Sequence, residues 1–130
     1  MATSYVEYDG KGFWASDVDI EFWLYALAEA VGPDAPQWLR ALQDHWRVQA
    51  TNTFGGCHDT GLSSLANVEQ RASVLAHARK TLALLEAGPR TMTRESLNAM
   101  RLGGPGSVFT RDVPTELFLP TARKFIELLE

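Results

Sequence analysis

The segment between Ser16 and Gly32 predicts a helix with apolar side chains on two nearly opposite sides. A surface helix needs one apolar stripe, whereas a helix that is apolar all round is normally covered on both sides. The fold must therefore place this helix between other elements, or leave its second apolar side partly open for another molecule. On a wheel of about 3.6 residues per turn, the first apolar side carries Ile20, Trp23, Leu24, Leu27 and Val31. The second apolar side carries Val18, Phe22, Tyr25 and Ala26, flanked by Glu21 and Glu29.

A β-hairpin is predicted directly before this helix. Residues 4–8 alternate in polarity and are rich in β-forming types, and Asp9-Gly10 follows them before a second aromatic run. An Asp-Gly pair between two such runs is a strong signal for a tight hairpin turn. Because two strands alone are marginally stable in water, we expect the hairpin to pack on helices, where its aromatic residues form a lid over the second apolar side. These residues are Tyr5, Tyr8, Phe13 and Trp14.

Capping residues and Gly-Pro pairs divide the rest of the chain into further helices. The sequence therefore predicts a mainly α fold: a small bundle of four to five helices with a short N-terminal β-hairpin packed on the first helix. Residues 51–66 are rich in glycine and small polar residues and predict a long loop. The expected helix starts are Ser16 with Asp19, Asp34 to Pro36 with Asp34 as the cap, Asn67 with Gln70, Thr93, and a last helix with Pro120 either in its first turn or at a kink within a slightly longer helix.

Length and hydropathy place the chain among single-domain proteins without a membrane span. The 130 residues are enough to bury a core, and their 45% hydrophobic content argues against intrinsic disorder. A lone Cys57 excludes a disulfide framework within the chain. The longest apolar run, residues 22–28, is far shorter than the roughly 20 residues that span a bilayer, and we find no signal peptide. We therefore expect one globular domain over residues 1–130, located in the cytoplasm and not in a membrane.

Acidic and aromatic residues are concentrated in the first 35 residues. This stretch holds seven acidic residues against one basic residue, and seven of the thirteen aromatic residues. Acids beside aromatic rings repel a nucleic-acid backbone and attract a basic protein surface, and such rings with a polar rim are typical of interface hot spots. In the alternative interpretation the rings belong to the core and the acids form a solvated rim. The candidate partner-binding residues are Tyr5, Tyr8, Asp9, Trp14, Asp17, Glu21, Phe22, Tyr25 and Glu29.

One short motif suggests chemistry, the Cys57-His58-Asp59 run within the predicted loop. Adjacent residues on an extended chain point away from each other, so Cys57 and His58 do not readily form a thiolate–imidazole pair. The histidines, the cysteine and the acids show none of the recognised metal-ligand spacings, and no glycine-rich phosphate loop is followed by the required residues. We therefore expect no catalytic residues, no metal and no cofactor.

The leading hypothesis is a non-enzymatic protein-binding module that binds a basic protein partner through its acidic, aromatic-rich N-terminal face, and that does not bind nucleic acid. In general character the chain is similar to small bacterial immunity and inhibitor proteins, which are acidic, aromatic-rich single domains without catalytic motifs. This similarity covers no specific motif and carries over no residue. One alternative is a small enzyme or ligand binder that uses the Cys57-His58-Asp59 loop. Another is a self-associating structural protein, a homodimer that buries the second apolar side of the first helix.

Overall fold

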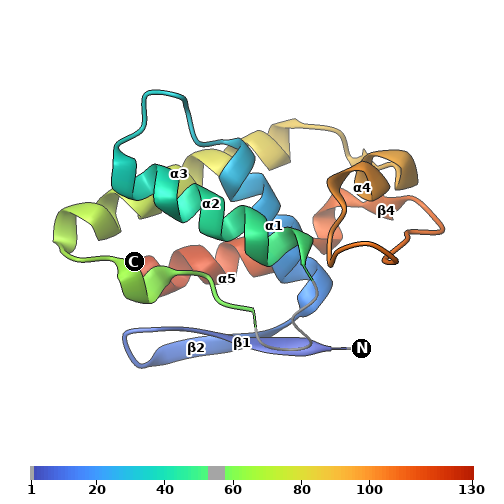
Figure 1. Cartoon of the computed structure of the whole chain (residues 1–130). Helices are drawn as coiled ribbons and strands as arrows, with labels where there is room; N and C mark the ends of the chain where they lie inside the picture. Colours follow the sequence, from blue (N-terminus) through green and yellow to red (C-terminus); the bar gives the residue numbers. More distant parts are fainter. Residues whose placement is uncertain (1, 53–57) are drawn as a thin grey trace.

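The computed structural model describes residues 2–52 and 58–130, and within them the chain forms five α-helices and two small antiparallel sheets (Figure 1). The predicted mainly α fold with an N-terminal hairpin is confirmed. The elements are β1 (Thr3–Tyr8), β2 (Lys11–Ser16), α1 (Asp17–Glu29), α2 (Gln37–Thr51), α3 (Val68–Ala87), β3 (Thr91–Met92), α4 (Arg94–Met100), β4 (Val113–Pro114) and α5 (Leu119–Leu129), with short 3-10 turns at Leu62–Ser64 and Thr115–Leu117.

The hairpin of β1 and β2 lies along one side of the helices and packs on α1 and α5 (Figure 1). Asp9 and Gly10 both adopt positive φ, 54° and 78°, as the tight turn predicted for an Asp-Gly pair requires. The resulting register places Tyr5 opposite Trp14 and Tyr8 opposite Lys11. The predicted hairpin is therefore confirmed.

Helix α1 is the central helix, and α2, α3, α5 and the hairpin all contact it. It begins as the sequence predicts, because the Ser16 side chain accepts a hydrogen bond from the backbone N–H of Asp19. Most of its first apolar side is buried in one hydrophobic cluster with side chains of the other helices. At its far end, Gln43 of α2 donates to the carbonyl of Ala28, and Nε2 of His77 of α3 lies 2.8 Å from the carbonyl oxygen of Leu27.

The expectation that the hairpin aromatics cover the second apolar side of α1 is wrong. Phe22, on that side, stacks instead on Phe118 at the start of α5, with ring centroids 4.0 Å apart. For two of the four aromatics the reason is strand alternation: Val6 is buried, so its neighbour Tyr5 and the residue paired with Tyr5, Trp14, face away from the helices. The other two, Tyr8 and Phe13, share the inner face with Val6 and pack on the core, but they lie beside Arg71 of α3 and Lys124 of α5. The rest of the second side is only partly covered.

The other helix starts follow the predicted caps with one exception. The side chain of Asn67 caps α3, that of Thr93 caps α4, and Pro120 lies in the first turn of α5. Asp34 does not cap α2, which begins after Pro36 and has no side-chain cap. Of the predicted 51–66 loop, residue 51 belongs to α2 and residues 62–64 form a 3-10 turn, while 53–57 lie outside the described residues.

Candidate functional site

The nine predicted partner-binding residues lie in three separate places. Four are on the hairpin and its turn, two are in a buried polar cluster beneath the hairpin, and three line a groove beside α1. In that order they are Tyr5, Tyr8, Asp9 and Trp14; Asp17 and Glu21; and Phe22, Tyr25 and Glu29. The sequence prediction treats these places as one face, and the structure separates them.

The outer face of the hairpin displays an aromatic pair. Trp14 is 66% exposed and Tyr5 is 45% exposed, and their ring centroids lie 5.2 Å apart at an angle of 53°. Gly12 leaves room for this arrangement, because a Cβ there would lie 2.5 Å from both Cζ of Tyr5 and the backbone oxygen of Val6. The strand register and the missing side chain of Gly12 together place the two rings side by side on the surface.

Acidic side chains accompany this aromatic pair. Glu7 lies two residues after Tyr5 on β1, on the same face of the strand, and is exposed. Asp9 is exposed in the hairpin turn. Lys11, at the start of β2, is exposed as well, so the acidic excess at this end of the hairpin is small.

The ring of Tyr8 is partly covered by Arg71 of the same chain. It is half-buried, and the guanidinium carbon of Arg71 on α3 lies 5.4 Å from the centre of its ring, which is cation–π geometry. A shallow depression of about 470 Å³, lined by Glu7, Tyr8, Asp9 and Ser63, lies at this end of the hairpin. Tyr8 therefore contributes less exposed ring to a partner surface than Tyr5 or Trp14.

Asp17 and Glu21 belong to a buried polar cluster, which we define as Ser4, Asp17, Glu21 and His58. The hydroxyl of Ser4 donates to Oδ1 of Asp17 at 2.7 Å and accepts from the backbone N–H of His58 at 3.3 Å. Nε2 of His58 lies 2.8 Å from Oε2 of Glu21, and its Nδ1 lies 3.6 Å from Oδ1 of Asp17. The side chains of Glu21 and Asp17 are only 8% and 13% exposed, so these acids contribute little to an exposed docking face.

The cluster joins segments that are far apart in the sequence. It connects β1, α1 and the segment that begins at His58, and Gly103 approaches it from the loop after α4. A Cβ on Gly103, which has φ +75°, would lie 3.2 Å from a carboxylate oxygen of Glu21. The His58 side chain is only 1% exposed, so its imidazole is enclosed within the fold.

The third place is a groove that contains much of the second apolar side of α1. Phe22 is buried by Phe118, whereas Tyr25 is half-buried and Glu29 is exposed, with Oε1 of Glu29 3.9 Å from Arg47 of α2. The pKa of Tyr25 is raised above its usual value, mainly by burial and further by the negative charge of Glu29. The hydroxyl of Tyr25 therefore keeps its proton at neutral pH.

The residues of the Cys57-His58-Asp59 run, which the enzyme alternative uses, do not form one site in the structure. Cys57 lies outside the described residues, and His58 is enclosed in the buried polar cluster. Asp59 lies instead beside His45 of α2, whose Nε2 is 3.1 Å from the carbonyl oxygen of Asp59 and 3.5 Å from its carboxylate. These two residues line a pocket of about 400 Å³ together with Trp38 and the 61–64 turn. Within residues 2–52 and 58–130, no group of three or more His, Cys, Asp or Glu side chains is arranged to hold a metal ion.

Comparison with known proteins gives no relative from which a function could be transferred. The chain matches no protein family, no curated protein and no solved structure. Among the helices of the described residues, none is both long and apolar enough to cross a membrane.

Sequence reasoning missed the buried polar cluster and most of the groove. It treats Asp17 and Glu21 as surface acids, although their spacing of four residues places them on one side of α1. One signal is Ser4, a polar residue at an inward position of an alternating strand, because such a residue needs a buried polar partner. No comparable signal indicates that residues of α3, β3 and α4 line the groove.

Proposed function

We propose that this chain is a non-enzymatic protein-binding module that docks a basic protein partner on the outer face of its N-terminal hairpin. The observation that carries the proposal is the exposed pair of Trp14 and Tyr5. Large aromatic side chains near polar groups on a surface are typical anchors of protein interfaces. Because the two rings contact each other, part of their motion is lost before a partner binds, which lowers the entropic cost of docking.

The charge beside the rings supports a partner with a basic surface. Glu7, on the same face of β1 as Tyr5, and Asp9, in the hairpin turn, are both exposed and carry two negative charges against the positive charge of Lys11. Carboxylates at the edge of an interface speed the encounter with a basic protein and select the sign of the partner's charge. Since Glu21 is buried and Glu29 lies beside the groove, Glu7 and Asp9 are the acids that would act in this encounter.

We further propose that docking inhibits the partner, as in immunity and inhibitor proteins, and that this occurs in the cytoplasm. The support for this part is the general character of the chain, a small acidic protein that presents aromatic anchors on a hairpin. Its test is the activity of the identified partner, measured with and without the purified protein.

The proposal is tested by affinity capture from a native extract with three baits of equal concentration. The baits are the wild-type protein, the double variant Tyr5→Ser/Trp14→Ser, and the control Val108→Ser, which changes an exposed apolar residue elsewhere. We expect a basic protein that the wild-type and control baits retain and the double variant loses. The purified partner should then bind the wild type directly, more weakly as salt is raised.

Identical captured proteins from all three baits would contradict the proposal. Circular dichroism and urea unfolding of the double variant ensure that a loss of binding does not reflect a loss of folding. The variant Glu7→Lys/Asp9→Asn should reduce the association rate with the partner about tenfold at low salt, because it reverses the sign of the local charge while Asn tolerates the positive φ of the turn. An unchanged rate would show that these acids do not steer the encounter.

A further inference from the structure

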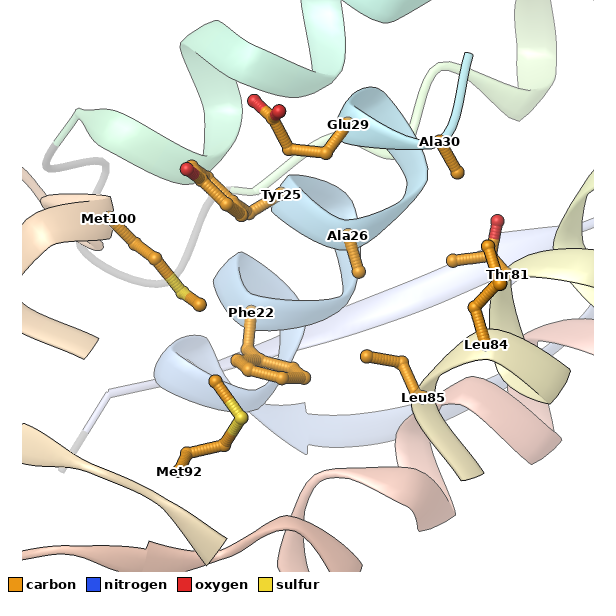
Figure 2. Close-up of a pocket in the computed structure, with 10 residues that line it drawn as sticks. All are labelled: Phe22, Tyr25, Ala26, Glu29, Ala30, Thr81, Leu84, Leu85, Met92 and Met100. Atoms are coloured by element: carbon orange, nitrogen blue, oxygen red, sulfur yellow. The ribbon is translucent and has the colours of Figure 1, made fainter. Parts of the chain in front are cut away.

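A second candidate site is the apolar groove between α1, α3, β3 and α4, which is separate from the outer face of the hairpin. It encloses about 270 Å³ and is open to solvent along one side. Figure 2 shows Phe22 and Met92 at one end, Leu85 on the α3 side and Met100 on the α4 side. This volume is just below the range of sites that bind drug-sized molecules, so it fits one ring with a short chain.

The apolar end of the groove is suited to a ring or a branched hydrocarbon group. Phe22 is held in place by its stack on Phe118 and is 2% exposed, so it forms a fixed, closed floor at this end of the groove. Met92 and Met100 are half-buried, and unbranched thioether side chains adapt to the shape of an apolar ligand. Ala26 lies one turn along α1 from Phe22, toward Glu29, and its small side chain leaves the middle of the groove free (Figure 2).

The opposite end carries a negative charge and an aromatic ring. The carboxylate of Glu29 and the hydroxyl of Tyr25 lie at the same end (Figure 2). Among the described lining residues Glu29 is the only charged one, and none is a lysine, arginine or histidine. Arg47 approaches Glu29 only to 3.9 Å, and both side chains are about half exposed, so a ligand can compete for this carboxylate.

We propose that the groove binds a small hydrophobic cation, a ring joined by a short chain to an ammonium group. The ring packs on Phe22 between the two methionines, and the ammonium group lies near the ring of Tyr25 and the carboxylate of Glu29. Phe22 and Glu29 are seven residues apart on α1, which corresponds to about 10 Å along the helix. A ring with a chain of about three or four carbons matches this distance.

The test uses 4-phenylbutylamine as the probe and the full-length protein. Two matched probes keep the ring and chain but replace the ammonium group with a hydroxyl (4-phenylbutanol) or a carboxylate (4-phenylbutyrate). Titration followed by two-dimensional NMR should give a Kd of about 0.1–1 mM for the amine and at least about tenfold weaker binding for the other two. The shifted signals should map to Phe22, Tyr25, Met92 and Met100.

Two variants and a control locate the binding. Glu29→Gln removes the charge and should weaken amine binding about tenfold, so that the amine and the alcohol bind equally. Ala26→Phe should abolish binding of all three probes by filling the groove. The control Glu69→Gln, which removes an exposed acid of α3 outside the groove, should leave the Kd unchanged. If Ala26→Phe fails to fold, the Kd values of the three probes, measured with the wild type and with Glu29→Gln, still show whether the groove selects the ammonium group.

Three results would overturn the proposal. Equal binding of amine, alcohol and carboxylate by the wild type would show that the charged end does not select a ligand. Absence of signal shifts at 10 times the expected Kd would show that the groove does not bind this class of ligand. A dimer in sedimentation experiments that Ala26→Phe dissociates would show that a second copy occupies the groove.

Discussion

The two faces of the N-terminal hairpin use alternate residues of the same strands in different ways. On the inner face Val6 is buried against the core and Ser4 enters the buried polar cluster. On the outer face Tyr5 and Trp14 remain largely in water. Because successive side chains of a strand point to opposite sides, one short hairpin can both anchor itself and display a surface. Substitutions on the inner face should reduce stability, and substitutions on the outer face should reduce binding.

The acids of the N-terminal region show the same contrast. Glu7 and Asp9 are exposed beside the outer face, whereas Asp17 and Glu21 lie within the structure next to His58. The excess of acids in the first 35 residues therefore overstates the negative charge that a partner meets. Asp17 and Glu21 are expected to contribute to stability, whereas Glu7 and Asp9 are expected to contribute to binding.

Glu21→Ala is expected to have the largest effect on stability. It removes the carboxylate that lies 2.8 Å from Nε2 of His58, in a site where both side chains are buried. Removing one partner of a buried polar contact leaves the other without its partner, which costs about 2–3 kcal/mol; urea unfolding followed by circular dichroism would measure this loss. The matched variant Glu7→Ala on the outer face should change the free energy of unfolding by less than about 0.5 kcal/mol. Equal losses would show that the buried polar cluster does not anchor the fold.

Val6→Ala should have the next largest effect. The side chain is 3% exposed, and its truncation removes two buried methyl-sized groups and leaves a small cavity. We expect the free energy of unfolding to fall by about 2 kcal/mol. The control Val108→Ala makes the same chemical change at a residue that is 70% exposed, and should have little effect. A small effect of Val6→Ala would mean that the inner face packs loosely on the helices.

Ser4→Ala should cost somewhat less, because it removes hydrogen bonds but little volume. It leaves Asp17 without the hydroxyl that donates to it at 2.7 Å and the backbone N–H of His58 without its 3.3 Å acceptor. The expected loss in the free energy of unfolding is about 1.5 kcal/mol, measured by urea unfolding. Thr3→Ala removes a hydroxyl from the neighbouring exposed position and serves as the control. If the two losses are equal, the contact between Ser4 and Asp17 has no net stabilising effect.

Local features of this fold could be predicted from the sequence because they depend on residues close together in the chain. The turn at Asp9-Gly10 and the caps at Ser16, Asn67 and Thr93 each involve contacts within about three residues, and all are confirmed. Asp34 fails as a cap even though it is local, because α2 starts only after Pro36.

Features formed by distant residues could not be predicted in this way. His58 meets Glu21 across 37 positions, and Phe22 meets Phe118 across 96. Apolar periodicity identifies the second apolar side of α1, but it does not show that Phe118, rather than the hairpin, covers Phe22. The sequence therefore predicts that this side of α1 needs a cover, and only tertiary packing determines which part of it stays open.

The smallest expected effect is the coupling between the two rings of the outer face. Tyr5→Ala and Trp14→Ala should each change stability little, whereas a double-mutant cycle should give a coupling energy of about 0.5–1 kcal/mol because the rings are cross-strand neighbours in contact. Urea unfolding of the wild type, both single variants and the double variant measures this energy. Additive effects would show that the rings move independently in the free protein. The rings would then not be held in place before docking, although both would still be exposed to a partner.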